Sequence, residues 1–248
     1  MEGYGTMPGA AMACMTVSLL IAFGLPLGLG LFFRRRGGRW RAFLLGAAVF
    51  LVFALVLEQR AHQLIQGGPA GGVITGDLGL YALYGGLMAG LFEETGRFAA
   101  FQLLRRSGKG GTPQDALIYG AGHGGMEAVL LVGLTNVSNL LLSFWLNTGT
   151  LEQHMGQLDD AAAQALAAAV AAPPHTYLWG GLERIVAVAI HISLSVLVWR
   201  AVERRASLWL FPAAIALHAG VELVALVWAV ALAVLARWIW RQREKKSL

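Results

Sequence analysis

Ionisable side chains interrupt apolar runs that are otherwise long enough to cross a bilayer. Glu93, Glu94 and Arg97 lie in one such run, and histidines or further glutamates lie in each of the three runs that follow. A charged group at bilayer depth costs at least ~2.5–3.5 kcal/mol, so such residues usually face the interior of a helical bundle and mark a functional site. The pattern therefore predicts membrane-spanning helices that share a polar centre.

The composition is that of a membrane protein. Of the 248 residues, 57% are hydrophobic and 13% are charged, whereas a soluble domain carries about 25% charged residues. Because one span takes about 20 apolar residues, we expect an all-α, polytopic transmembrane bundle of six or seven spans, forming a single integral membrane domain over residues 1–248. Two spans are expected at residues 10–33 and 41–57 (or 41–65), followed by a four-helix catalytic core at residues 77–104, 115–147, 177–199 and 208–238.

Features between and within the spans carry further predictions. The glycine-rich stretch 67–76 is expected to be a flexible loop, and the alanine-rich run within 151–174 is expected to form a surface helix. Pro212 is expected to kink the last helix. The single Cys14 excludes an intrachain disulfide.

Basic residues cluster at the ends of the apolar runs, as in cytoplasmic loops of a multi-pass plasma-membrane protein. This bias predicts cytoplasmic basic loops that contact lipid headgroups, and an N-terminus outside. With six spans the basic tail at residues 237–246 would also lie outside, which conflicts with the rule unless a seventh span is present or the last segment turns back. Nucleic-acid binding is excluded because no folded basic face remains.

The polar residues share one depth. Glu94, His123, His191 and His218 lie 9 to 14 positions from the nearest basic cluster, or roughly 14–21 Å along a helix. That level is near the middle of a bilayer about 30 Å thick. Four neighbouring helices are therefore expected to contribute to one site.

Spacing within the helices places these residues on shared faces. Arg97 follows Glu93 by four positions and Glu94 by three, so it can neutralise one carboxylate while the other acts as a base. His123 and Glu127 are four apart, in a glycine-rich run that begins after Tyr119 and permits close helix packing. Two further pairs have the same spacing: His191 with Ser195, and His218 with Glu222.

Three histidines and several carboxylates suit hydrolysis of a carbonyl bond. His123, His191 and His218 are candidate ligands of zinc or a similar metal. Without a metal, the same groups could activate water and stabilise an oxyanion. The metalloprotease motif H-E-x-x-H and the serine-hydrolase motif G-x-S-x-G are both missing from the sequence.

Together, from residue 81 to residue 222, these motifs resemble the YhfC-type intramembrane metalloproteases, which are grouped with the CAAX prenyl endopeptidases and bacteriocin-processing (CPBP) proteins. The resemblance implies an all-helical membrane peptidase that acts on a membrane-embedded or lipidated protein or peptide substrate. It also implies that Glu93 polarises water and that Glu94, paired with Arg97, supports it. Two departures leave open which glutamate is the base and what Glu222 does: two residues rather than three precede Arg97, and Glu222 stands where Asn or Asp is common.

The resemblance gives the histidines and their neighbours separate roles. His123 and His218 would bind the water or a metal, and His191 would be a further ligand or stabilise the oxyanion. Tyr119, Glu127, Ser195 and Glu222 are the supporting candidates. Two alternatives are a proton- or cation-coupled transporter and a catalytically silent scaffold or immunity relative. A transporter is favoured by inverted repeats, which are not evident in the sequence, and a silent copy has no physical reason to bury Glu93.

Overall fold

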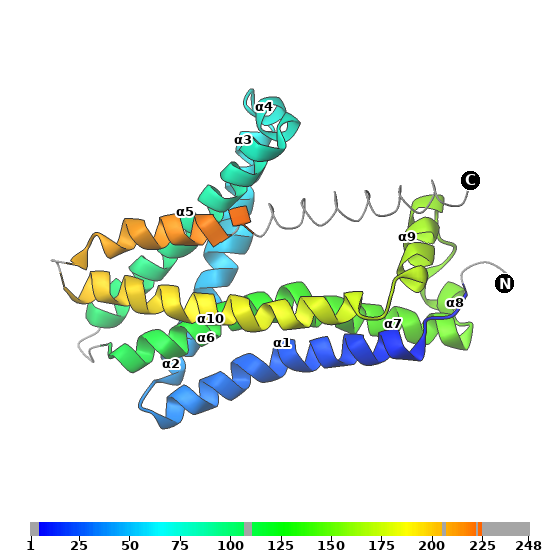
Figure 1. Cartoon of the computed structure of the whole chain (residues 1–248), viewed down its shortest axis with the longest axis horizontal. Coiled ribbons are helices and arrows are strands. Elements are labelled where there is room, and N and C mark those ends of the chain that lie inside the picture. Colours follow the sequence, from blue (N-terminus) through cyan, green and yellow to red (C-terminus); the bar gives the residue numbers. More distant parts are fainter. Residues whose placement is uncertain (1–4, 107–110, 205–206, 222, 225–248) are drawn as a thin grey trace, which may run out of the picture. The chain divides into compact units, whose positions relative to one another are not determined.

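In the computed structural model, residues 5–106, 111–204, 207–221 and 223–224 are described, and all their regular elements are helical (Figure 1). The prediction of an all-α polytopic membrane bundle is confirmed. The helices are α1 (Gly9–Arg35), α2 (Trp40–Val49), η1 (Phe50–Glu58), α3 (Gln59–Gln66), α4 (Gly71–Gly76), α5 (Leu78–Arg106), α6 (Pro113–Ala128), η2 (Val129–Gly133), α7 (Leu134–Thr148), α8 (Leu151–Met155), α9 (Asp160–Ala171), α10 (Thr176–Glu203) and a last helix, Leu210–Val221.

Four helices in the described part of the chain are long and apolar enough to cross a membrane: Gly9–Arg35, Trp40–Gln66, Pro113–Thr148 and Thr176–Glu203. Each coincides with a predicted span. The predicted span at residues 77–104 is α5, which has 29 residues and carries the charged motif. The predicted span at residues 208–238 is described only as far as residue 224, so the basic tail lies outside the described residues.

Two of the spans contain a π-helical stretch. η1 continues α2 into α3, and η2 continues α6 into α7, with right-handed helical backbone at each junction. π-Helical turns are uncommon and occur often at functional sites. Here η1 ends at Glu58, and η2 begins just after Glu127 and Ala128.

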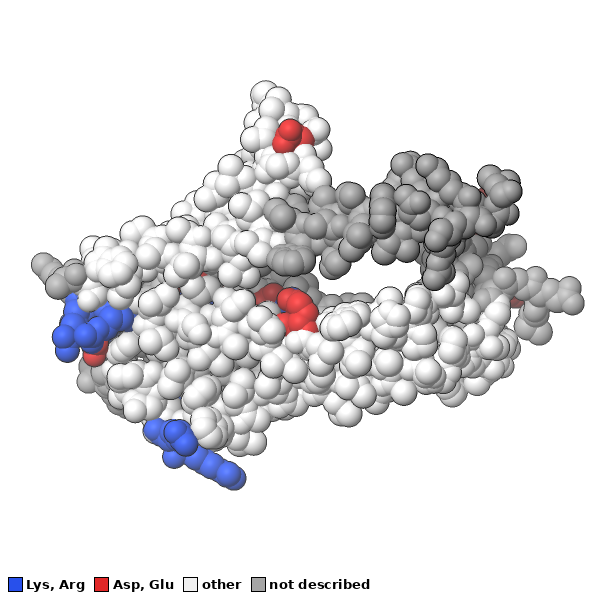
Figure 2. Space-filling model, in the orientation of Figure 1, with Lys and Arg blue, Asp and Glu red and all other residues white. Residues whose placement is uncertain are grey.

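The chain forms two compact units, each of which is described separately. The first unit comprises Met1–Ala48 and Thr112–Ser195. In it α1 packs against α6, η2 and α7, and the Ser18 hydroxyl of α1 donates to the Tyr177 carbonyl of α10 at 2.6 Å. Figure 2 shows the α1 surface almost without charged side chains until basic ones appear where α1 ends, at Arg34 and Arg35.

The second unit comprises Val49–Gly111 and Val196–Leu248. In it α5 packs against η1 and α4. The Phe101 ring of α5 meets the Trp199 ring of α10 edge to face, with centroids 5.5 Å apart. α5 is therefore the central described helix of this unit, and it carries Glu93, Glu94 and Arg97.

The start of α6 is fixed by a buried carboxylate. Asp115 accepts hydrogen bonds from the backbone N–H and the hydroxyl of Thr112, at 2.8 and 3.1 Å, which completes a capping box. It also accepts from the Arg39 backbone N–H at 3.1 Å and from Arg39 Nε at 2.9 Å. The side-chain hydrogen bond to Asp115 raises the pKa of Arg39 above its ordinary value, and the negative charge of Asp115 acts in the same direction.

Of the predictions about connecting segments, one was wrong and one was confirmed. The stretch 67–76, predicted as a loop, contains α4, and a Cβ on Gly71 would lie 1.8 Å from the Gln66 carbonyl oxygen. Glycine at position 71 therefore permits a tight turn between two helices. Pro212 lies in the first turn of its helix, where proline is tolerated, and the kink predicted there stays a prediction. The predicted surface helix is α9, none of whose residues is buried.

Candidate active site

Glu94 and Arg97 form a buried ion pair within one turn of α5. Both side chains have no solvent exposure, and Arg97 Nη1 donates to Oε1 and Oε2 of Glu94 at 2.9 and 3.0 Å. The i, i+3 spacing on a helix brings the two side chains together. Of the two glutamates that the sequence offered, the structure thus pairs Glu94 with the arginine.

His218 joins this pair from the last helix. Its Nδ1 lies 2.8 Å from Glu94 Oε1, and the residue is 3% exposed. The last helix can approach α5 closely because of two glycines: a Cβ on Gly86 or Gly90 would lie 2.6 Å from the carbonyl oxygen of Ala219 or Ile215, respectively. Small residues four apart are a known signature of close helix packing in membranes. This spacing of Gly86 and Gly90 is visible in the sequence but was not used for any prediction.

Glu93 adds a second acid to the same buried turn, where it is 7% exposed. Two carboxylates and one guanidinium in the same buried turn carry an excess negative charge, which is costly away from water. A proton on Glu93 or on His218 balances that charge. The cluster in the second unit, which comprises Glu93, Glu94, Arg97 and His218, is therefore suited to holding and releasing a proton.

A second cluster lies in the first unit and is centred on Glu127 of α6. Arg184 Nη1 donates to Glu127 Oε1 at 2.5 Å, and His191 Nε2 lies 2.6 Å from Glu127 Oε2. Both partners come from α10, two turns apart. Arg184 also pairs with Glu183. The side chains of Glu127 and Arg184 remain 14% and 11% exposed, so this cluster is less completely enclosed than the Glu94 pair.

His123 packs between aromatic neighbours in this second cluster. Its buried ring lies 5.0 Å from the His191 ring and 6.0 Å from the Tyr119 ring, measured between centroids. The predicted close packing of the glycine-rich helix is confirmed, because a Cβ on Gly120 would lie 2.5 Å from Ile192 Cα, and one on Gly124 would lie 3.0 Å from the His191 side chain. The helix that packs closely against Gly120 and Gly124 is α10.

Of two further supporting candidates, the structure describes Ser195 but not Glu222. The Ser195 hydroxyl donates to the His191 carbonyl oxygen at 2.7 Å, within its own helix. Ser195 thus satisfies the backbone of α10 one turn from His191. Glu222 lies outside the described residues.

The donor chemistry fits a divalent metal ion such as zinc. Histidines that bind metals usually direct their other ring nitrogen to a carboxylate, which orients the ring. His191 does so toward Glu127 through Nε2, and His218 toward Glu94 through Nδ1. The ligand atoms would then be Nδ1 of His191 and Nε2 of His218. His123 and His191 belong to the first unit and His218 to the second, and their convergence on one ion stays a prediction.

A further polar group in the second unit was not among the predicted site residues. Glu58 is buried, and its Oε1 lies 3.2 Å from His62 Nε2, while His62 Nδ1 lies 2.7 Å from the Tyr84 hydroxyl. Glu58 and His62 have the same i, i+4 spacing as the predicted pairs. They lie in the extension of the second span to residue 65, which was predicted only as an alternative.

Comparison with known proteins points to one family. The model of a family described as "YhfC intramembrane metalloprotease" matches residues 18–240. The "Uncharacterized membrane protein YhfC" of Bacillus subtilis (strain 168) is 38% identical over 213 residues, which cover 84% of this chain and 81% of that protein. No solved structure matches the chain.

Proposed function

The chain belongs to the YhfC intramembrane metalloprotease family, and on this premise we propose that it is a peptidase that hydrolyses a peptide bond of a membrane-associated substrate. The observation that carries the proposal is the carboxylate of Glu94, held between Arg97 and His218, with Glu93 beside it in the same buried turn. We propose different tasks for these two adjacent acids.

Glu94 is the positioning residue and Glu93 is the general base. The oxygens of Glu94 already accept from Arg97 and contact His218, so Glu94 orients the imidazole. Glu93 takes a proton from water as the water oxygen bonds to the substrate carbonyl carbon. That proton then passes to the amide nitrogen, the C–N bond breaks, and the products are a carboxylic acid and an amine.

The first unit contributes the groups that stabilise the charge formed during attack. Glu127 orients His191, and His123 and His191 stabilise the negative oxygen of the tetrahedral intermediate. When bound, a divalent ion would act as a Lewis acid toward the water and the carbonyl oxygen. His123, His191 and His218 are the residues that would hold it. In this proposal both clusters serve one reaction.

The setting of the reaction follows from the membrane character of the chain. It is a membrane protein with several apolar helices, and its relative in Bacillus subtilis is named a membrane protein. The proposal places it in the plasma membrane as a multi-pass protein, with basic loops cytoplasmic and the N-terminus outside. Its substrate is a membrane-embedded or lipidated protein or peptide, and its wider kinship is with the CPBP superfamily.

The test is cleavage by the purified full chain in nanodiscs, using a panel of membrane-anchored reporter peptides. Glu93→Gln keeps the shape of the side chain but cannot accept the proton, so we expect cleavage to fall by about 10²–10⁴-fold. Glu152→Gln is the matched control, because Glu152 is an exposed acid on α8 outside both clusters. Unchanged cleavage by Glu93→Gln would contradict the assignment of the base.

Metal content and ion transport provide the second arm of the test. We expect the wild type to retain zinc or another divalent ion after dialysis, and His123→Ala to retain less, as measured by elemental mass spectrometry. Uptake of a labelled cation into liposomes that is lost in Glu93→Gln, without cleavage of any reporter peptide, would overturn the peptidase in favour of a transporter.

A further inference from the structure

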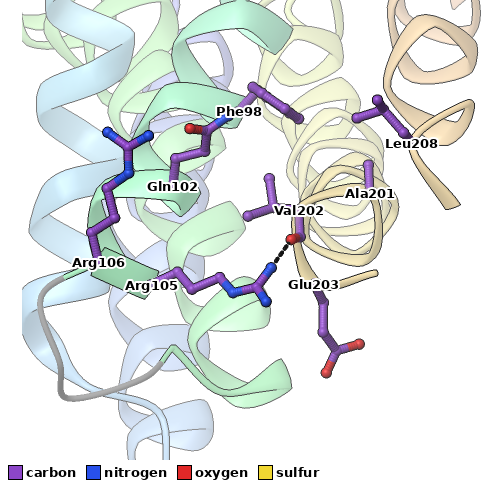
Figure 3. Close-up of a pocket in the computed structure, with 8 residues that line it drawn as sticks. All are labelled: Phe98, Gln102, Arg105, Arg106, Ala201, Val202, Glu203 and Leu208. Atoms are coloured by element: carbon purple, nitrogen blue, oxygen red, sulfur yellow. Dashed lines mark hydrogen bonds between the residues drawn. The ribbon is translucent and has the colours of Figure 1, made fainter. Parts of the chain in front are cut away.

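A pocket opens in the second unit where α5 and α10 end (Figure 3). Its volume is about 960 Å³, at the upper end of the roughly 300–1,000 Å³ typical of ligand pockets. None of its lining residues belongs to the two clusters described above. They are Phe98, Gln102, Arg105, Arg106, Ala201, Val202, Glu203 and Leu208.

The pocket is apolar at one end and basic at the other. Phe98 and Leu208 face each other in Figure 3, and Arg105 lies at the opposite end, where it donates to the Val202 carbonyl oxygen. Phe98 and Arg105 are seven positions apart on α5, or roughly 10 Å along the helix. The lining therefore changes from hydrocarbon to guanidinium over about the depth at which a phospholipid changes from acyl chain to headgroup.

The charge of the pocket favours an anion. Arg105 and Arg106 both line it, and the acid that lines it, Glu203, forms an ion pair with Arg200 at 2.7 Å. The Val202 carbonyl holds Arg105 at the end of α10, which reduces the conformational entropy that the side chain loses on binding. A guanidinium has five N–H donors, so one bond to a carbonyl leaves capacity for phosphate oxygens.

We propose that this pocket binds one anionic phospholipid of the surrounding bilayer, with its phosphate at Arg105, an acyl chain along Phe98, Val202 and Leu208, and Arg106 adding positive charge at the rim. The ends of spanning helices lie at headgroup level, where pockets lined by basic residues between helices bind anionic headgroups. The inference is independent of the peptidase proposal, because it involves none of the clustered glutamates or histidines.

The test measures binding of dioctanoyl phosphatidylglycerol to the purified full chain in a neutral detergent by native mass spectrometry. The double variant Arg105→Gln/Arg106→Gln is expected to bind about 30-fold more weakly, because each arginine near a headgroup contributes about fivefold. The matched control is Arg34→Gln/Arg35→Gln, which removes the same charge from the last turn of α1. The control is expected to change binding by less than threefold.

A second variant keeps the arginines in place. Leu208→Asp puts an acid into the apolar wall and is expected to weaken binding at least fivefold, whereas Leu31→Asp, at a position equally exposed on α1 (52% against 51%), should not. Equal weakening in the α1 controls would overturn the proposal, since binding would then be diffuse attraction to basic residues. Equal affinity for dioctanoyl phosphatidylcholine, or for glycerol 3-phosphate without acyl chains, would also overturn it.

Discussion

Two carboxylates in this chain, Glu94 and Glu127, each contact one arginine and one histidine, but they are assembled in opposite ways. Glu94 contacts Arg97, which lies three positions away on the same helix, and His218, which lies 124 positions away on another helix. Glu127 takes both Arg184 and His191 from α10. The Glu94 pair is fully buried, whereas the Glu127 pair keeps some exposure.

This difference indicates how each cluster depends on its surroundings. The pair of Glu94 and Arg97 can form as soon as α5 is helical, whereas the contact of Glu94 with His218 depends on tertiary packing. Arg184 and His191 reach Glu127 only when α6 and α10 pack together. Full burial also makes the Glu94 pair costly to break, because a single charge would then remain away from water.

The largest expected effect comes from replacing Arg97 and, in a separate variant, Arg184. Arg97→Met leaves Glu94 buried without its cation, so we expect the free energy of unfolding to fall by about 3–5 kcal/mol. Arg184→Met should cost less, about 1.5–3 kcal/mol, because Glu127 is partly exposed. Chemical unfolding in mixed micelles measures both, with Arg60→Met on exposed α3 as the control, expected within about 0.5 kcal/mol of wild type. Equal losses at positions 97 and 184 would remove the contrast between the clusters.

A smaller effect is expected from the glycines that allow the helices to meet. Gly90→Ala and Gly120→Ala place a methyl group within 2.6 Å of the Ile215 carbonyl oxygen and 2.5 Å of Ile192 Cα, respectively. Forcing these backbones apart should cost about 1–3 kcal/mol of stability and displace His218 or His191, lowering peptide cleavage at least tenfold. Gly85→Ala is the control, since nothing lies within 4 Å of the added Cβ. Unchanged cleavage in Gly90→Ala would show that the position of His218 does not matter.

The smallest effect is expected outside both clusters. Asp159 caps α9 by accepting from the Ala162 N–H at 2.8 Å, so Asp159→Ala should weaken this helix by about 0.5–2 kcal/mol. Hydrogen exchange of the α9 amides measures that loss, and peptide cleavage should stay within twofold of wild type. A large loss of cleavage would give α9 a role that neither cluster explains.

The spans could be predicted from the sequence because apolar length and end signals act locally. The segment predicted at residues 115–147 is a helix over Pro113–Thr148, which begins with a capping box and proline in its first turn. The segment predicted at residues 77–104 is α5, Leu78–Arg106. Glycine misled the prediction at residues 67–76, because Gly71 permits a tight approach between consecutive helices and was taken as a sign of flexibility.

The site could be predicted only in part. The pairing of Arg97 with one of two glutamates follows from helical spacing. Which histidine contacts which acid depends on how helices distant in the sequence pack together. That packing cannot be inferred from a single sequence. The contact between His218 and Glu94 and the bond from Arg184 to Glu127 therefore had to come from the structure. That all the proposed catalytic residues serve one reaction stays a prediction.

Asp115 has a consequence for the helix that carries His123 and Glu127. Four of the 16 residues of α6 are glycine, and a glycine has no side chain of its own to set the lengthwise register of a helix against its neighbour. By binding Thr112 at the start of α6 and Arg39 before α2, Asp115 pins the helix at one end. A single carboxylate thus sets the position of α6, and of every side chain that it carries, relative to Arg39.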